Sequence, residues 1–191
     1  MENPDQQLDT LREENCRLQQ ELEEAKRHAA NFAREMFLSD LMGNHQITQT
    51  EYETALQDYS FHFPSLWFAV VLIQVEPEFS ALFSKDAVPT QESLRHVRFL
   101  VRNVLEELIG EKNICHVITV QGQLAALVNL LEPPAQAMCS IAAAAEQAAQ
   151  LFESHYDSVI CFSVSRCHQG YTQIHAAYED ASSLVQYRTM A

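Results

Sequence analysis

The chain has 191 residues, of which 47% are hydrophobic, and it carries a formal net charge of −14. This length and apolar content predict one globular domain with an extension. The negative charge argues against a nucleic-acid-binding surface within the chain, because phosphate contact needs clustered lysine and arginine. No apolar run approaches the ~20 residues that cross a bilayer, so we expect no direct membrane contact.

The cysteines point to a compartment. The chain has five of them, widely spaced and without a C-x-x-C pair. This odd number and spacing argue against a disulfide framework or a zinc knuckle. Free cysteines persist in a reducing compartment, and the polar, acidic N-terminus does not resemble a signal peptide. We therefore expect a cytoplasmic protein.

The first predicted element is a long helix from about residue 7 to Gly43, rich in Glu, Gln, Leu, Ala and Arg. Its apolar residues recur at heptad spacing over four heptads, which favours a coiled coil. We expect residues 1–43 to form a signalling helix that pairs two chains in parallel; the alternative is an amphipathic helix folded onto its own domain. The a positions are Leu8, Asn15, Leu22, Ala29 and Met36, and the d positions are Leu11, Leu18, Ala25 and Phe32.

Asn15 indicates how the helices pair. A single buried Asn at an a position fixes the register and favours two parallel strands, at some cost in stability. The small layers at Ala25 and Ala29 predict a weak coil. Glu21 at a g position and Lys26 at the following e position offer an interchain ion pair.

Residues 44–191 alternate helix and strand patterns. Thr48 and Glu51 form a capping-box signature for a short helix. The apolar run 66–76 predicts a buried strand, and residues 90–110 predict a helix that ends at Gly110. Its expected inner face comprises Leu94, Val97, Val101, Val104, Leu105 and Leu108.

A hairpin and three further elements follow. Residues 115–131 predict two strands joined by a turn at Gln121, Gly122 and Gln123. Pro133 and Pro134 start an alanine-rich helix, residues 157–166 predict a fourth strand, and a last helix closes the chain. The residues of that last helix expected to face inward are Ile174, Tyr178, Ala181, Leu184 and Val185.

The order β-α-β-β-α-β, then α, predicts an α/β (α+β) domain of the ferredoxin-like kind over residues 44–191. In that arrangement a four-stranded antiparallel sheet carries both crossover helices on one face. The opposite face would be open.

Motifs of catalysis and metal binding are missing from the sequence. It contains no P-loop, G-x-S-x-G, G-x-G-x-x-G or H-E-x-x-H motif. Cys115–His116 and Cys167–His168 lack the second ligand at short spacing that a zinc site uses, so we expect no metal. Arg95, Arg98 and Arg102 recur on the outer side of one predicted helix; we expect a solvated face there, the alternative being an anion contact.

The residues of the hairpin tip argue against phosphoryl-transfer activity. Glu76 and Glu78 follow the first predicted strand and could hold Mg²⁺. A nucleotide cyclisation site would also need acidic residues at the tip to complete the ion's coordination. Gln121 and Gln123 stand there, and neutral amides cannot replace carboxylates. We therefore expect no catalytic residues, no cofactor and no enzyme activity.

The strand, the hairpin and the long preceding helix together resemble a degenerate GGDEF-type nucleotidyl cyclase fold. The catalytic stretch Gly-Gly-Asp/Glu-Glu-Phe of that family would fall on Val120, Gln121, Gly122, Gln123 and Leu124. Only the closing apolar residue is kept in type. The family's acidic metal-binding position after the first strand would fall near Gln74 or Glu76.

Four segments also look like the GGDEF-like middle region of certain bacterial AraC-family transcriptional regulators. They are residues 34–44, 67–76, 98–109 and 174–188. In those regulators a sensory or receiver segment precedes the module and helix-turn-helix units follow it. The resemblance implies a non-catalytic homodimeric module that relays a signal to a DNA-binding domain absent from this chain. The alternatives are a sensor that binds a small molecule or nucleotide on the open sheet face and, less favoured, an active diguanylate cyclase.

Overall fold

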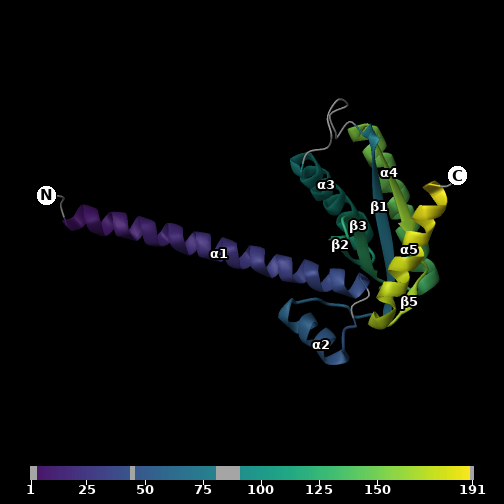
Figure 1. The fold of residues 1–191 in the computed structure, drawn as a ribbon, viewed down its shortest axis with the longest axis horizontal. Helices are drawn as coiled ribbons and strands as arrows, with labels where there is room; N and C mark the ends of the chain where they lie inside the picture. Colours follow the sequence, from purple (N-terminus) through teal and green to yellow (C-terminus); the bar gives the residue numbers. More distant parts are fainter. Residues whose placement is uncertain (1–3, 44–45, 81–90, 190–191) are drawn as a thin grey trace. The chain divides into compact units, whose positions relative to one another are not determined.

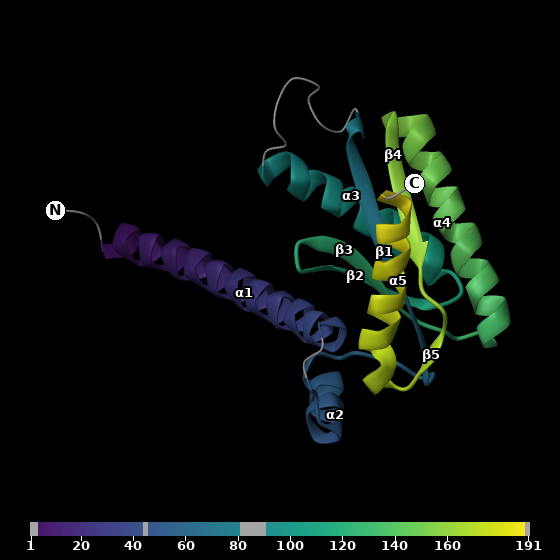
Figure 2. The same ribbon diagram turned by 45° about the vertical axis from the view of Figure 1, so that its right-hand side comes forward.

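The structure is a computed structural model, and it describes residues 4–43, 46–80 and 91–189. The chain forms two compact units, Met1–Phe37 and Leu38–Ala191. Figures 1 and 2 show the elements, which in chain order are α1 (Pro4–Met42), α2 (Gln49–Asp58), β1 (Trp67–Ser80), α3 (Gln91–Gly110), β2 (Ile114–Val120), β3 (Gln123–Asn129), α4 (Pro134–Tyr156), β4 (Ser158–Val164), β5 (His168–Gln169), the 3-10 helix η1 (Tyr171–Gln173) and α5 (Ile174–Thr189).

The sheet confirms the ferredoxin-like prediction. Its strands lie in the order β2-β3-β1-β4, and the described pairs are antiparallel. β1 therefore takes a central position, which its run of fully buried residues requires because both faces of a central strand are covered. The two-residue strand β5, which the sequence did not predict, pairs with Trp67 and Phe68 at the start of β1.

The main core lies between the sheet and the helices α3 and α4. α3 buries Val97, Val101, Leu105 and Ile109, one residue per turn, while the predicted Val104 and Leu108 are half-buried. Leu94 lies outside the residues whose side chains are described. On α4, Ala137, Ala144 and Ala148 are buried in this core, and Phe152 is buried near the end of the helix.

α5 covers the opposite face of the sheet (Figure 2). Ile174, Tyr178 and Ala181 are buried as predicted, but Leu184 is 50% exposed, so its predicted inward position is wrong. At 100° per residue, Leu184 falls about 80° from Ile174, at the edge of the buried face. The Nδ1 atom of His175 lies 2.7 Å from the carbonyl oxygen of Met42, which ties α5 to the last turn of α1.

The expected open sheet face is therefore closed. Val70, Leu72 and Leu127 on this face are fully buried. Beyond α5, the segment between α2 and β1 contributes Phe61 and Phe63. The ring of Phe61 lies 5.2 Å from that of His116, and the ring of Phe63 lies 5.6 Å from that of Phe68.

β1 is longer than the sequence predicted. It continues to Ser80, so Glu76 and Glu78 lie within the strand instead of following it. Its register with β4 shifts between Val75 and Ser80. Such an irregularity accommodates Pro77, which has no N–H for the sheet ladder.

The capping box of α2 is confirmed. The amide of Glu51 donates to Oγ1 of Thr48 at 3.3 Å, and the amide of Thr48 donates to Oε2 of Glu51 at 2.8 Å. α2 packs through Tyr52, whose ring stacks on that of Tyr171 with centroids 4.2 Å apart. Desolvation raises the pKa of Tyr52 to about 12.

None of the helices described combines the length and the apolar character that crossing a bilayer requires.

Candidate functional site

The hairpin tip is a two-residue turn. β2 ends at Val120 and β3 begins at Gln123, and these two residues pair. Gln121 has φ 49° and Gly122 has φ 85°. Positive φ at both central residues is the mark of a type I′ turn, whose twist matches that of the two strands. The structure thus places the predicted stretch Val120–Leu124 across the tip of a hairpin.

A cavity of about 490 Å³ lies beside this tip. Three other elements complete its wall: the stretch Ile73–Glu76 of β1, Val97 and Arg98 of α3, and Val185 of α5. The sheet order explains the convergence, because β3 lies next to β1 and brings the tip alongside that stretch of β1. The fold therefore joins the two regions that the sequence singled out separately, the end of the first strand and the hairpin.

The cavity has an apolar inner part and a polar rim. Ile73, Val97 and Leu124 are buried. The polar lining residues are Gln74, Glu76, Arg98, Gln121 and Gln123. Amides both donate and accept hydrogen bonds, and Arg98 adds a planar cation. The arrangement can therefore hold a small polar ligand by hydrogen bonds.

Metal chemistry finds little support in the described residues. Glu76 is the one carboxylate in the described lining of the cavity. The side chain of Glu78 lies outside the described residues. Nowhere in the described part of the chain do three or more His, Cys, Asp or Glu side chains gather as a metal site would require.

Arg98 belongs to the site, although the spacing of the arginines predicted a solvated face for it. It is half-buried and lines the cavity, whereas Arg95 is exposed. The spacing of the arginines was the available signal. The spacing could not distinguish Arg98 from Arg95 and Arg102. Arg98 lines a cavity only because the fold brings the β2–β3 hairpin next to α3.

Cys115 and His168, which lie in strands, contact the core and a neighbouring carboxylate respectively. Cys115 is buried in the core, and desolvation raises the pKa of its thiol above the ordinary range. A thiol of this kind is a small apolar side chain and a poor nucleophile. Nε2 of His168 lies 2.8 Å from Oδ2 of Asp180, which also accepts from Nε of Arg166 at 3.0 Å.

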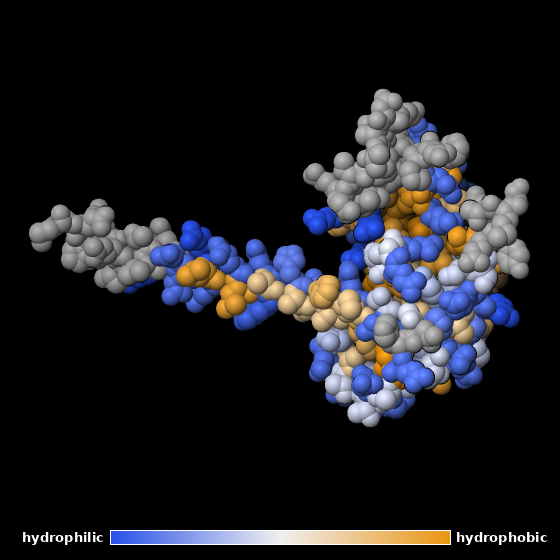
Figure 3. Space-filling model, in the orientation of Figure 1, coloured by the Kyte–Doolittle hydropathy of each residue, from blue (hydrophilic) through white to orange (hydrophobic). Residues whose placement is uncertain are grey.

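The predicted heptad positions lie on α1 and are exposed wherever their side chains are described. Leu18 and Leu22 are each 54% exposed and Phe32 is 67% exposed. Hydrophobic surface marks the helix in Figure 3. The side chains of Leu8 and Leu11 lie outside the described residues. The exposed members of the predicted set are Asn15, Leu18, Leu22, Ala25, Ala29, Phe32 and Met36.

An antiparallel sheet in the order β2-β3-β1-β4, with β5 paired to β1 and crossover helices packed against it, defines an α+β domain. The family described as the GGDEF-like domain matches residues 55–187. This range covers most of the chain and includes the whole described wall of the cavity, so the chain belongs to the GGDEF-like domain family. No curated protein and no solved structure matches the chain.

Proposed function

We propose that this chain is a non-catalytic regulatory and dimerisation module of a bacterial transcriptional regulator of the AraC family. It pairs two chains through α1 in the cytoplasm and relays an upstream signal to a DNA-binding domain. The similarity of four sequence segments to the middle region of those regulators supports the class. The observation that carries the proposal is the exposed heptad surface of α1.

Dimerisation follows from the cost of leaving that surface in water. Burying apolar surface stabilises by about 25 cal/mol per Å². Leu18, Leu22 and Phe32 expose more than half of their surface and lie on one side of the helix at heptad spacing. Pairing with a second copy would bury them in knobs-into-holes packing.

The ion pairs of α1 favour modest affinity. Nζ of Lys26 lies 2.8 Å from Oε1 of Glu23, and Nε of Arg17 lies 3.6 Å from Oε1 of Glu21, all within one helix. An interchain pair between Glu21 and Lys26 must compete with these contacts. Exposed ion pairs of this kind contribute only a few tenths of a kcal/mol, so they select orientation more than strength.

A weak coil suits a relay. The layers at Ala25 and Ala29 bury little surface, and Asn15 adds a polar layer. A signal that changes the register or splay of two such helices needs to supply only about 1–3 kcal/mol of coupling free energy. The domain behind the coil would pass this change on.

The chemistry of the hairpin supports a non-catalytic role. Phosphoryl transfer with two metal ions needs several carboxylates around the ions. Where active members of the resembled family carry two acidic side chains, the hairpin tip has Gly122 and Gln123, and neither supplies a carboxylate. Incubating the full chain with GTP and Mg²⁺ should yield no cyclic or linear dinucleotide by chromatography. Product formation would overturn the non-catalytic assignment.

Sedimentation equilibrium across 1–200 μM tests the dimer, with the concentration range chosen to span about micromolar affinity. The full chain should shift from monomer towards dimer. Leu22→Glu should keep it monomeric, because it places two charges in an apolar layer. Arg27→Gln, at an outer f position, lowers the net charge equally and should leave the mass unchanged. A monomeric wild type at the highest concentration, or a dimeric Leu22→Glu chain, would contradict the proposal.

The cavity at the hairpin tip favours a second candidate, a sensor of a small molecule or nucleotide. Its volume of about 490 Å³ lies within the range of ligand pockets. Calorimetry with cyclic dinucleotides and nucleoside triphosphates tests it. Micromolar binding that is lost in Arg98→Ala and kept in Arg95→Ala would favour the sensor. No heat with any of these ligands would leave the relay as the better account.

A further inference from the structure

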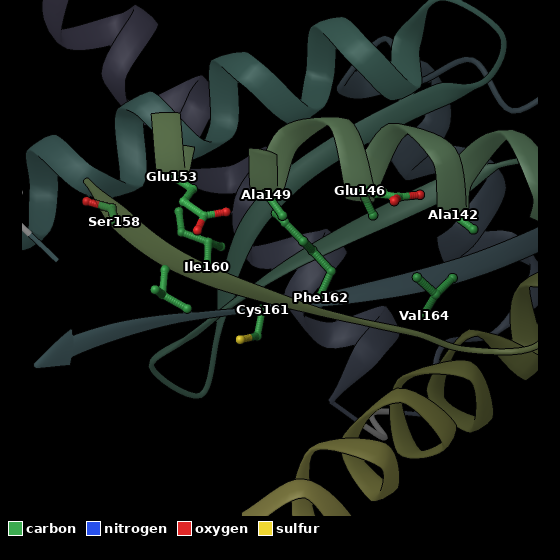
Figure 4. Close-up of a pocket in the computed structure, with 11 residues that line it drawn as sticks. Ala142, Glu146, Ala149, Glu153, Ser158, Ile160, Cys161, Phe162 and Val164 are labelled. Atoms are coloured by element: carbon green, nitrogen blue, oxygen red, sulfur yellow. The ribbon is translucent and has the colours of Figure 1, made fainter. Parts of the chain in front are cut away.

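Besides the cavity at the hairpin tip, the domain has a groove at the outer edge of the sheet. It has a volume of about 470 Å³ and runs between α4 and β4. The small side chains of Ala142, Ala145 and Ala149 leave this space on the helix side. In Figure 4, Phe162 points from β4 towards Ala149, whereas Cys161 points to the other side of the strand.

β4 offers main-chain hydrogen bonds along this groove. It is the last strand in the sheet order, and β1 is its one partner among the described strands. The amide of Ser165 donates to the carbonyl oxygen of Val70 at 2.9 Å, so residue 165 directs its main chain towards β1. Successive residues of a strand alternate in this direction. Ile160, Phe162 and Val164 therefore direct their N–H and C=O groups outward.

On the opposite edge of the same sheet, one outward main-chain group is covered. At β2, the amide of Val117 donates to Oε1 of Glu106 at 2.9 Å, so a side chain of α3 occupies an outward main-chain group. No side chain in the described ranges forms such a bond with Ile160, Phe162 or Val164. Exposed strand edges are templates for pairing with another chain, and folds commonly protect them. The difference singles out β4 as the edge that is left available.

The groove also carries a charge. Glu146 and Glu153 of α4 line it and are exposed. They are seven residues apart, so they lie on one side of α4, about 10.5 Å apart along its axis. Neither has an ion pair among the described residues. A ligand in the groove therefore meets two unpaired carboxylates beside a row of main-chain donors and acceptors.

We propose that β4 and α4 form a docking edge for an extended, lysine- or arginine-bearing segment of a partner polypeptide. The segment adds a strand to β4, places a small apolar side chain against the alanines, and pairs its cations with Glu146 and Glu153. Main-chain bonds supply affinity in this mode, and side-chain pockets supply specificity. The negative charge of the groove disfavours a second copy of this chain as the partner. Antiparallel pairing of two β4 strands would bring Glu146 and Glu153 of one copy close to the same two residues of the other.

A designed probe tests the docking edge. The peptide acetyl-Thr-Lys-Thr-Val-Thr-Lys-Thr-amide places both lysines and the valine on one face of a strand, since side chains alternate. Labelled peptide should bind the full chain in fluorescence anisotropy, and it should shift the amide NMR signals of Ile160, Phe162 and Val164.

N-methylation separates strand addition from simple charge attraction. In antiparallel pairing, residues that share a face with the groove side chains also direct their N–H groups at β4. Methylating the central valine nitrogen should therefore abolish binding, while methylating the nitrogen of the preceding threonine should not. Replacing both lysines with glutamate should also abolish it. Equal binding of the two methylated peptides would overturn strand addition.

Protein variants test the charge. Glu146→Gln/Glu153→Gln should weaken the lysine peptide about tenfold, since two exposed charge pairs are lost. The matched variant Glu107→Gln/Glu111→Gln changes the net charge equally at the C-terminal end of α3 and should bind within about twofold of wild type. No binding of the lysine peptide overturns the proposal. So does concentration-dependent protection of the β4 amides in the Leu22→Glu chain alone, because the edge would then be an interface between copies.

Discussion

Apolar side chains differ in solvent exposure between the sheet domain and α1. In the sheet domain, Leu72 and Leu127 are 0% exposed, held between helices and strands far apart in sequence. On α1, Leu18 and Leu22 are 54% exposed. The residue type is the same, and the difference lies in what the fold brings near it. The domain buries most of its large apolar side chains in its own core, whereas the described heptad positions of α1 are exposed.

The comparison separates stability from association. Core substitutions in the domain should change the free energy of unfolding and leave dimerisation intact. Substitutions at the heptad positions of α1 should do the reverse. Four predictions test this separation, in order of decreasing effect.

Removing a core aromatic should have the largest effect. Phe152 is fully buried between α4 and the sheet. Phe152→Ala should lower the free energy of unfolding by about 3–5 kcal/mol, because it leaves a cavity. Urea denaturation followed by circular dichroism measures it. Phe99→Ala is the control: Phe99 is 61% exposed on α3, so its loss should cost well under 1 kcal/mol. Equal losses in the two variants would mean that the described core is wrong.

A buried amide should come next. Asn129 at the end of β3 is fully buried. Its Nδ2 donates to the carbonyl oxygens of Ser65 at 2.7 Å and Trp67 at 3.1 Å, and its Oδ1 accepts from the amide of Ser65. Asn129→Ala leaves these groups without their partner and should cost about 2–3 kcal/mol in the same urea measurement. The exposed Asn103→Ala should cost less than about 0.5 kcal/mol. A loss for Asn129→Ala as small as that control would contradict this role.

The third prediction concerns α1. Asn15→Leu replaces a polar a layer with an apolar one and should tighten self-association about tenfold, equivalent to ~1.4 kcal/mol. Sedimentation equilibrium measures the change, while the urea midpoint of the domain should stay the same. Asn31→Leu, at an outer c position, adds the same side chain away from the seam and should change neither quantity. A tenfold change in both variants would point to unspecific apolar attraction.

The smallest effect should be the pH dependence at the loop before α5. The hydrogen bond from Arg166 lowers the pKa of Asp180 below its ordinary 3.8, with a further contribution from His168. A carboxyl group whose pKa is lowered by folding stabilises the fold above its unfolded pKa, and this contribution is lost as the pH falls through the folded pKa. Asp180→Asn should therefore cost about 0.5–1 kcal/mol at pH 6, since the pair is partly exposed.

The pH series distinguishes this ion pair from a packing effect. The difference between wild type and Asp180→Asn should shrink as the pH falls below about 4. A difference for Asp180→Asn that stays constant from pH 6 to pH 3 would show that charge does not cause it.

Much of the fold could be predicted because its signals are local. The capping box at Thr48, the turn at Gln121 and Gly122, and the helix after Pro134 each depend on residues within one turn of one another. The predictions were wrong where the structure depends on contacts between residues far apart in the sequence. The path of β1 past Pro77 depends on how β4 pairs with it, and β5 exists because the start of β1 extends beyond the last residue of β4 that pairs with it.

The candidate site follows the same division. The absence of acidic side chains from the hairpin tip could be read directly, since it is a matter of residue type. The cavity could not be predicted, because its wall runs from Ile73 to Val185 and includes Arg98 of α3. Nor could the open groove beside β4 be distinguished from the edge at β2, where Glu106 reaches Val117.

The sequence by itself determined the strand and helix periods, the turn and the heptad surface of α1, because each arises from interactions between near neighbours in the chain. Tertiary structure alone decided which faces and edges are covered. Coverage is set by the packing of elements far apart in sequence: α5 closes the face that the strand pattern left open, and the order of the strands leaves β4 at the edge.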